Sequence, residues 1–86
     1  MAKERRPYKS RNLKRTIKIA GRLTSVALEE AYWRSLREIA NARKTSLFGL
    51  ITEIDRQREH VNLASELRHF CLNYFRDRAG FPPIKK

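Results

Sequence analysis

Polar and apolar side chains alternate in two short stretches between residues 15 and 28. The first stretch is Arg15–Ile19, the second is Leu23–Leu28, and Gly21 lies between them. Alternation with a period of two and the presence of β-branched residues predict extended chain, and a glycine permits a bend. The second stretch therefore has two faces, which carry Thr24, Val26 and Leu28 on one side and Leu23, Ser25 and Ala27 on the other.

From residue 29 onward the apolar residues recur with the helical period and form three separate stripes. Thr45-Ser46 precedes the second stripe and Asn62 precedes the third, where such side chains can cap a helix N-terminus. Gly80 and Pro82-Pro83 end the third stripe. The sequence thus predicts one strand region followed by three helices. The stripes are Tyr32, Trp33, Leu36, Ile39 and Ala40, then Leu47, Leu50, Ile51 and Ile54, then Leu63, Leu67, Phe70, Cys71 and Tyr74.

The predicted strand needs a partner, because half of its backbone groups would otherwise lack hydrogen bonds. It can pair with Ile17–Ile19 in a hairpin or with the same strand of a second chain. A chain of 86 residues buries a small core, and its single cysteine, Cys71, excludes a disulfide within the chain. Two histidines and one thiol cannot complete a structural zinc site. Association of chains is the remaining source of stability, and both pairings stay open.

Positive charge is concentrated near the N-terminus. The chain has 20 Lys and Arg against 9 Asp and Glu, a net charge of +11. Residues 1–22 hold nine basic side chains and one acidic one, a net charge of +8, which leaves +3 for the other 64 residues. Residues 1–12 have almost nothing apolar to bury, so we expect a disordered basic arm there. The excess indicates a polyanionic partner. Nucleic acid fits better than a membrane surface, because the basic cluster lacks an interleaved apolar face.

No group of side chains is suited to catalysis or to metal binding. Glu53 and Asp55 are two residues apart, which turns them to different sides of a helix. Cys71 lies on an apolar stripe and is expected to be an inert buried thiol. We therefore expect no enzymatic activity, no cofactor and no metal. A lone thiol is typical of the reducing cytoplasm, and no run approaches the roughly 20 apolar residues that span a membrane.

The order of these features resembles the ribbon-helix-helix family, and in particular a bacterial branch of small stand-alone proteins. The resemblance covers about residues 13–76. Each motif is short, but the ordered set is fairly specific. The matching residues are the strand end Leu28–Glu30, the helix segment Trp33–Ala40, the turn residue Ser46, and the segments Leu47–Ile51, Glu53–Asp55 and Asn62–Leu63.

The resemblance implies a mainly α-helical fold with a short β-strand. In that family two chains form an intertwined homodimer through an intermolecular antiparallel two-stranded ribbon, which enters the major groove of double-stranded DNA. Further assembly on DNA stays open. The base-contacting residues implied here are Leu23, Ser25 and Ala27, with Arg22 at their flank. The start of the second helix would hold a phosphate, and the phosphate-contacting residues implied here are Lys14, Arg15, Lys18, Lys44, Thr45 and Ser46.

One departure concerns the three strand positions. Family members often carry Arg, Lys, Thr, Asn or Gln there, whereas here only Ser25 is polar. Leu23 and Ala27 can touch thymine methyl groups but cannot form hydrogen bonds with bases. The sequence therefore predicts a DNA-binding transcription regulator whose binding is either general or sequence-preferring.

The alternative function is an antitoxin-like or adaptor module whose third helix binds a protein. Phe70, Tyr74, Phe75 and the segment Phe81–Pro83 would supply the apolar surface. For the chain as a whole we expect a basic arm at 1–12, a ribbon-helix-helix domain with its C-terminal helix at 13–79, and a flexible tail at 80–86. Gly49 inside the second helix indicates either a close helix crossing in the dimer or a tolerated surface glycine.

Overall fold

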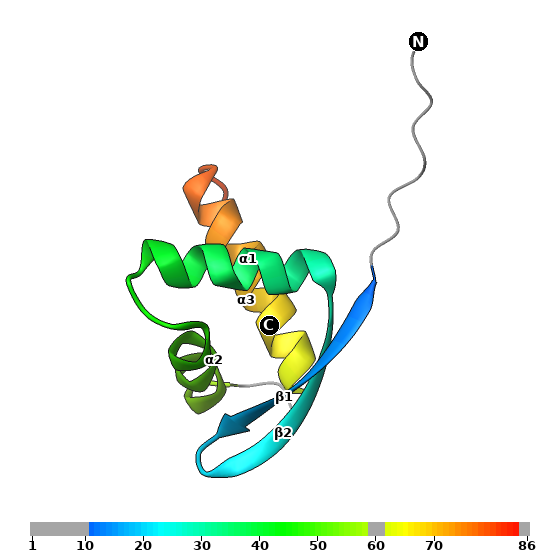
Figure 1. Cartoon of the computed structure of the whole chain (residues 1–86). Helices are drawn as coiled ribbons and strands as arrows, with labels where there is room; N and C mark the ends of the chain where they lie inside the picture. The colour runs from blue at the N-terminus through cyan, green and yellow to red at the C-terminus, as the bar shows by residue number, and fades with distance from the viewer. Residues whose placement is uncertain (1–10, 59–61, 85–86) are drawn as a thin grey trace.

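The computed structural model describes residues 11–58 and 62–84 of the chain. The predicted strand region followed by three helices is confirmed. The predicted arm at 1–12 lies almost wholly outside the described residues. The elements are β1 (Asn12–Ile19), β2 (Arg22–Glu29), α1 (Glu30–Ala42), α2 (Leu47–Arg56) and α3 (Leu63–Arg78) (Figure 1).

β1 and β2 form an antiparallel hairpin, with Asn12 opposite Glu29 at one end and Ile19 opposite Arg22 at the other. Ala20 and Gly21 join the strands with φ values of 52° and 82°. A two-residue turn with two positive φ angles has the twist that paired strands require. The strand that precedes α1 thus has a partner in the same chain, which is the hairpin pairing of the two that the sequence left open. The intertwined dimer with an intermolecular ribbon stays a prediction.

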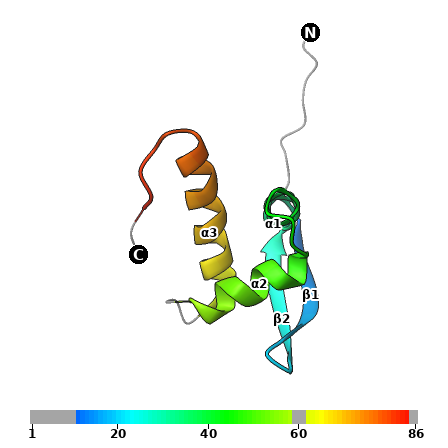
Figure 2. The same ribbon diagram turned by 90° about the vertical axis from the view of Figure 1, so that its left-hand side faces the viewer.

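The core lies between one face of the hairpin and the three helices. This inner face of the hairpin buries Ile17 and Ile19 from β1 and Val26 and Leu28 from β2. Seen from the side, α2 runs from the hairpin to α3, and α1 lies against the hairpin (Figure 2). All three predicted apolar stripes face this core. The largest fully buried side chains are Trp33, Leu28, Leu36, Ile39, Ile51 and Leu67.

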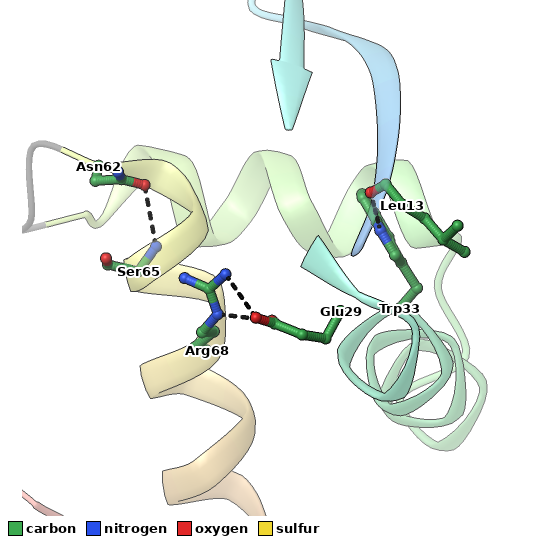
Figure 3. Close-up of polar contacts among 6 residues, drawn as sticks. All are labelled: Leu13, Glu29, Trp33, Asn62, Ser65 and Arg68. Carbon is green, nitrogen blue, oxygen red and sulfur yellow. Dashed lines mark hydrogen bonds and ion pairs between the residues drawn. The ribbon is translucent and has the colours of Figure 1, made fainter. Parts of the chain in front are cut away.

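Trp33 of α1 holds β1 in place. Its indole Nε1 donates a hydrogen bond to the backbone oxygen of Leu13 at 2.9 Å (Figure 3), and its side chain is fully buried. The backbone N–H of Glu30 donates to the oxygen of Arg11 at 2.7 Å, one step beyond the paired strands. The guanidinium of Arg15 lies 5.2 Å from the centre of the Trp33 ring. β1 is therefore attached to α1 as well as to β2.

Arg68 of α3 holds the end of β2. Its Nε and Nη2 atoms donate to Oε1 and Oε2 of Glu29 at 2.9 and 3.2 Å (Figure 3). These hydrogen bonds from Arg68 lower the pKa of the Glu29 carboxyl below its ordinary value. A carboxyl whose pKa is lowered by folding adds stability above its ordinary pKa, and this contribution is lost as the pH falls through the lowered value. The pair joins α3 to the strand that leads into α1.

The chain turns back along α3 after Gly80, which has a φ of 90°. The side-chain amide of Asn73 donates to the backbone oxygen of Ile84 at 3.1 Å and accepts from its N–H at 2.8 Å. Arg76 donates from Nε to the backbone oxygen of Pro82 at 3.0 Å. The sequence predicts a flexible tail at 80–86, whereas in the structure these hydrogen bonds connect Pro82 and Ile84 to α3.

Replacing Trp33 by Phe should lower the free energy of unfolding by about 2 kcal/mol, because the hydrogen bond to Leu13 is lost and a small cavity opens in the core. Urea unfolding followed by circular dichroism measures the change. Tyr32→Phe, next in sequence and half-buried, is the control and should change the stability by no more than about 0.5 kcal/mol. Equal stability of Trp33→Phe and the wild type would contradict the role given to Trp33.

Cys71 should be unreactive in the folded protein. Its side chain is 2 % exposed, and burial raises the pKa of its thiol to about 12. Since only the thiolate is nucleophilic, we expect modification by a disulfide reagent at pH 8 to require unfolding and to accelerate in denaturant. The neighbouring Leu72 is exposed, so Leu72→Cys in a Cys71→Ser background is the control and should react at once. Equal rates for the two thiols would show that Cys71 is accessible.

Candidate nucleic-acid interface

The outer face of the hairpin carries side chains from both strands. Residues directly opposite each other in an antiparallel pair share a face. The register places Lys14 opposite Ala27, Thr16 opposite Ser25 and Lys18 opposite Leu23. All of these side chains are exposed except that of Ala27, which is half-buried, and Leu23 is 74 % exposed. These three cross-strand pairs lie in a row, with a cation in the first and in the third. A fourth pair of the same parity, Asn12 opposite Glu29, lies at the base of the hairpin, where Arg68 binds Glu29.

The central pair of this face joins two hydroxyl groups. The Oγ1 atom of Thr16 lies 3.4 Å from the Oγ atom of Ser25, within hydrogen-bond distance, and either can be the donor. Ser25 was singled out from the sequence, whereas Thr16 was missed. The alternation within Arg15–Ile19 was the signal for Thr16, because it puts Thr16 and Lys18 on one polar face of this strand. That face joins the face of Ser25 once the strand is known to pair with β2.

Two of the arginines predicted from sequence lie on the other side of the hairpin. Arg22 is opposite Ile19 and Arg15 is opposite Val26, and both of these partners are buried against the helices. Arg15 and Arg22 therefore lie on the inner face by register, although their own side chains are exposed. Of the four residues expected to contact bases, Leu23, Ser25 and Ala27 share the outer face and Arg22 does not.

The first turn of α2 lies beside β1. Ser46 caps the helix, since its Oγ atom accepts a hydrogen bond from the N–H of Gly49 at 2.9 Å. Leu47 and Phe48 come next, and the N–H groups at the start of a helix have no acceptor within it. A cavity of about 350 Å³ separates this turn from the strand, and it is lined by Arg15, Thr16, Ile17, Ser46, Leu47 and Phe48. The structure thus brings the start of α2 next to the β1 edge of the hairpin.

The link between α1 and α2 explains how this turn is positioned. Lys44 has a φ of 59°, and the N–H of Thr45 donates to the backbone oxygen of Ala40 at 2.9 Å. This reversal closes α1 and sets Thr45 and Ser46 in front of α2. Three of the residues predicted to contact phosphates lie in this turn, and all three are exposed: Lys44, Thr45 and Ser46.

Gly49 allows the cap to close tightly. A Cβ atom at this position would lie 2.8 Å from the Oγ1 atom of Thr45 and 3.1 Å from the Oγ atom of Ser46. The nearest atoms therefore belong to the preceding turn and not to a crossing helix. A close helix crossing at Gly49 in the dimer stays a prediction.

The other edge of the hairpin is also flanked by the start of a helix. A cavity of about 430 Å³ lies between β2 and the N-terminus of α3, and Arg58 and Arg68 contribute to its wall. Asn62 caps α3 by accepting from the N–H of Ser65 at 3.2 Å (Figure 3). Arg58 and Arg68 form ion pairs with Asp55 and Glu29. Helix starts thus lie on both sides of the hairpin, and the arginines on the β2 side already have acidic partners.

Residues 11–58 and 62–84 contain no cluster of three His, Cys, Asp or Glu side chains placed to hold a metal ion. Within the same ranges, no helix combines the length and the apolar character needed to cross a membrane.

Residues 12–75 match the family model described as a ribbon-helix-helix domain. The fold is also similar to the solved structure of an uncharacterized protein from Bordetella pertussis Tohama I, with a TM-score of 0.72 and 32 % sequence identity. That similarity covers 81 % of this chain and 60 % of the other, so the chain spans less than two thirds of its relative. No curated protein matches the chain.

Replacing Ser46 by Ala should lower the free energy of unfolding by about 1 kcal/mol, because the N–H of Gly49 loses its acceptor. Aspartate is an equally good cap, so Ser46→Asp should stay within about 0.5 kcal/mol of the wild type. Thermal or urea unfolding of the three proteins measures the difference. A Ser46→Ala protein as stable as the wild type would show that the cap contributes nothing.

Proposed function

The chain belongs to the ribbon-helix-helix domain family, and on that premise we propose that it binds double-stranded DNA as a homodimer and regulates transcription. The hairpin enters the major groove, whose width admits a two-stranded ribbon. Leu23, Ser25 and Ala27 face the bases, and Arg22 reaches them from the end of the hairpin. The protein carries out no catalysis and acts in the cytoplasm.

The observation that carries this proposal is the outer face of the hairpin together with the start of α2. Of the six side chains in the three outer-face pairs nearest the turn, two are cationic, two carry hydroxyls and none is acidic, whereas Glu29 in the fourth pair is bound by Arg68. Leu23 and Ser25 are exposed on the face of the hairpin opposite the core, and Ser25 contacts Thr16 across the strands. A surface of this kind suits contact with base edges and with the phosphates beside them.

The proposed phosphate contacts surround this face. Lys14 and Lys18 extend from β1, Arg15 lies at its edge, and Lys44, Thr45 and Ser46 come from the turn before α2. N–H groups at the start of a helix and the helix dipole both favour an anion. The basic residues of the arm supply further contacts. A dimer with about six phosphate contacts loses about a thousandfold in affinity between 50 and 200 mM salt.

The dimer adds the contacts that a small domain needs. Among residues 11–58 and 62–84, fourteen apolar residues form the buried core, and Phe48 of α2 remains 56 % exposed. In the family two chains share their helices, and we propose the same association for this chain. Its symmetry would place two copies of the outer face on one DNA site.

A protein-binding surface on α3 is the second candidate function. Leu72 and Phe75 of α3 are exposed, and so are Phe81 and Ile84 of the segment that lies along it. Large apolar side chains gathered on one surface commonly mark a protein contact. This surface contains Phe75 and Phe81 of the predicted set, whereas Phe70 and Tyr74 pack against the core. Such a module could act together with DNA binding.

Ser46→Asp should reduce affinity for mixed-sequence duplex DNA about tenfold or more at low salt, because it adds a negative charge beside the proposed phosphate while keeping the helix cap. Ser25→Glu should have a similar effect at the outer face. Fluorescence anisotropy with a labelled duplex over a range of salt concentrations measures both, and the titration should end at two chains per site.

The matched control is Ala79→Glu, an exposed position at the far end of α3 that lowers the net charge by the same amount. It should retain nearly full affinity. Duplex affinity unchanged by Ser46→Asp and Ser25→Glu would contradict the proposed DNA-binding face. An equal loss of affinity in all three variants would also contradict it, because the change in net charge alone would then explain the loss.

A further inference from the structure

The centre of the outer face offers a paired set of hydrogen-bonding groups. Each hydroxyl has one donor and two acceptor positions. When one of Thr16 and Ser25 donates to the other across the 3.4 Å that separates their oxygens, the pair still has one donor and several acceptor positions for a ligand. The pair can therefore donate and accept at the same time, although neither side chain is long or charged.

A donor beside acceptors suits the major-groove edge of one base in particular. In the major groove adenine presents an acceptor, N7, beside a donor, the N6 amino group. Guanine presents two acceptors and is most often bound by Arg or Lys. The central pair of the face lacks a cation, whereas Lys14 and Lys18 stand in the pairs on either side. Adenine is thus the better match for the hydroxyls at the centre.

Methyl groups around the centre point to the base opposite adenine. Leu23 is 74 % exposed, Ala27 is half-buried, and both neighbour Ser25 on the same face of β2. Thr16 adds its own methyl group. Thymine is the one DNA base that presents a methyl group in the major groove, and apolar side chains recognise it.

The spacing of the hairpin agrees with the spacing of base pairs. Alternate residues on one strand are about 7 Å apart, which equals two base-pair steps of about 3.4 Å. If Thr16 and Ser25 lie over one base pair, the lysines of β1 lie about two base pairs to either side. Both strands of this two-stranded ribbon come from a single chain, so the polar positions of β1 can enter the groove together with β2.

We propose that β1 reads bases together with β2, that Thr16 and Ser25 are a specificity-determining pair, and that they select an A·T base pair at the centre of the contact. Leu23 and Ala27 contact the thymine methyl group. The inference rests on the proposed DNA binding and deepens it: it assigns a base-reading role to a strand that otherwise supplies only phosphate contacts.

Selection of bound sequences from a randomised duplex pool tests the assignment. The wild type should enrich A·T pairs at the central position. Thr16→Val keeps the methyl group and suits a strand, so it should fold normally while central discrimination falls about tenfold. Ser25→Ala should behave in the same way. Thr52→Val makes the same substitution on α2, away from the outer face, and should leave the preference unchanged. Lys14→Ala should weaken all sequences equally and reduce the salt dependence.

Modified bases test the same contacts without changing the protein. With a selected duplex, 7-deaza-adenine at the centre removes N7, and uracil in place of thymine removes the methyl group. Each should weaken wild-type binding, and 7-deaza-adenine should add little to the loss caused by Thr16→Val together with Ser25→Ala. Wild-type binding without a central A·T preference would overturn this inference and leave the proposed function standing. Absence of duplex binding by the wild type would overturn both.

Discussion

Backbone pairing between β1 and β2 is the interaction on which the other features depend. Each strand alternates between a buried and an exposed face, so a slip of one residue in either strand would bring Thr16 or Ser25 into the core and expose their apolar neighbours. The register is fixed at both ends. The turn at Ala20-Gly21 sets it at the tip, and the hydrogen bond from Trp33 to the oxygen of Leu13 sets it at the base. The same two constraints therefore determine the core and the composition of the outer face.

The helices serve the hairpin in two ways. Their apolar stripes cover its inner face, and their N-termini lie along its edges, with α2 beside β1 and α3 beside β2. The two edges differ in charge. The arginines beside β2 are paired with Asp55 and Glu29, whereas the capped first turn of α2 shares a cavity with Arg15 of β1, and Lys44 in the preceding turn is exposed. The side of β1 is thus the better place for an anion. This asymmetry follows from the short turn between α1 and α2, which Lys44 and Gly49 make possible.

Much of the fold could be predicted from the sequence because its signals are local. The helical stripes and the caps Ser46 and Asn62 depend on residues within one or two turns of each other. The strand's partner was not predictable in this way, because alternation assigns a face to each residue but does not identify the neighbouring strand. That gap explains why Thr16 was missed, because its place on the outer face follows from its position opposite Ser25. The crowding around Gly49 depends on the position of two hydroxyls in a preceding turn, which spacing alone does not reveal.

Under the proposed function, affinity and specificity for DNA would reside in different parts of this chain. Most of the net charge lies in the first 22 residues, and long basic side chains attract phosphates of any sequence. The outer face has short hydroxyl and apolar side chains at its centre. These side chains add little binding free energy at a distance, so they require close contact with particular base edges. Short side chains also lose little rotamer freedom when they bind. On that proposal the protein would attach to DNA through its cations and discriminate through the fit of the hairpin, so its specificity would depend on the register of β1 and β2 more than on its charge.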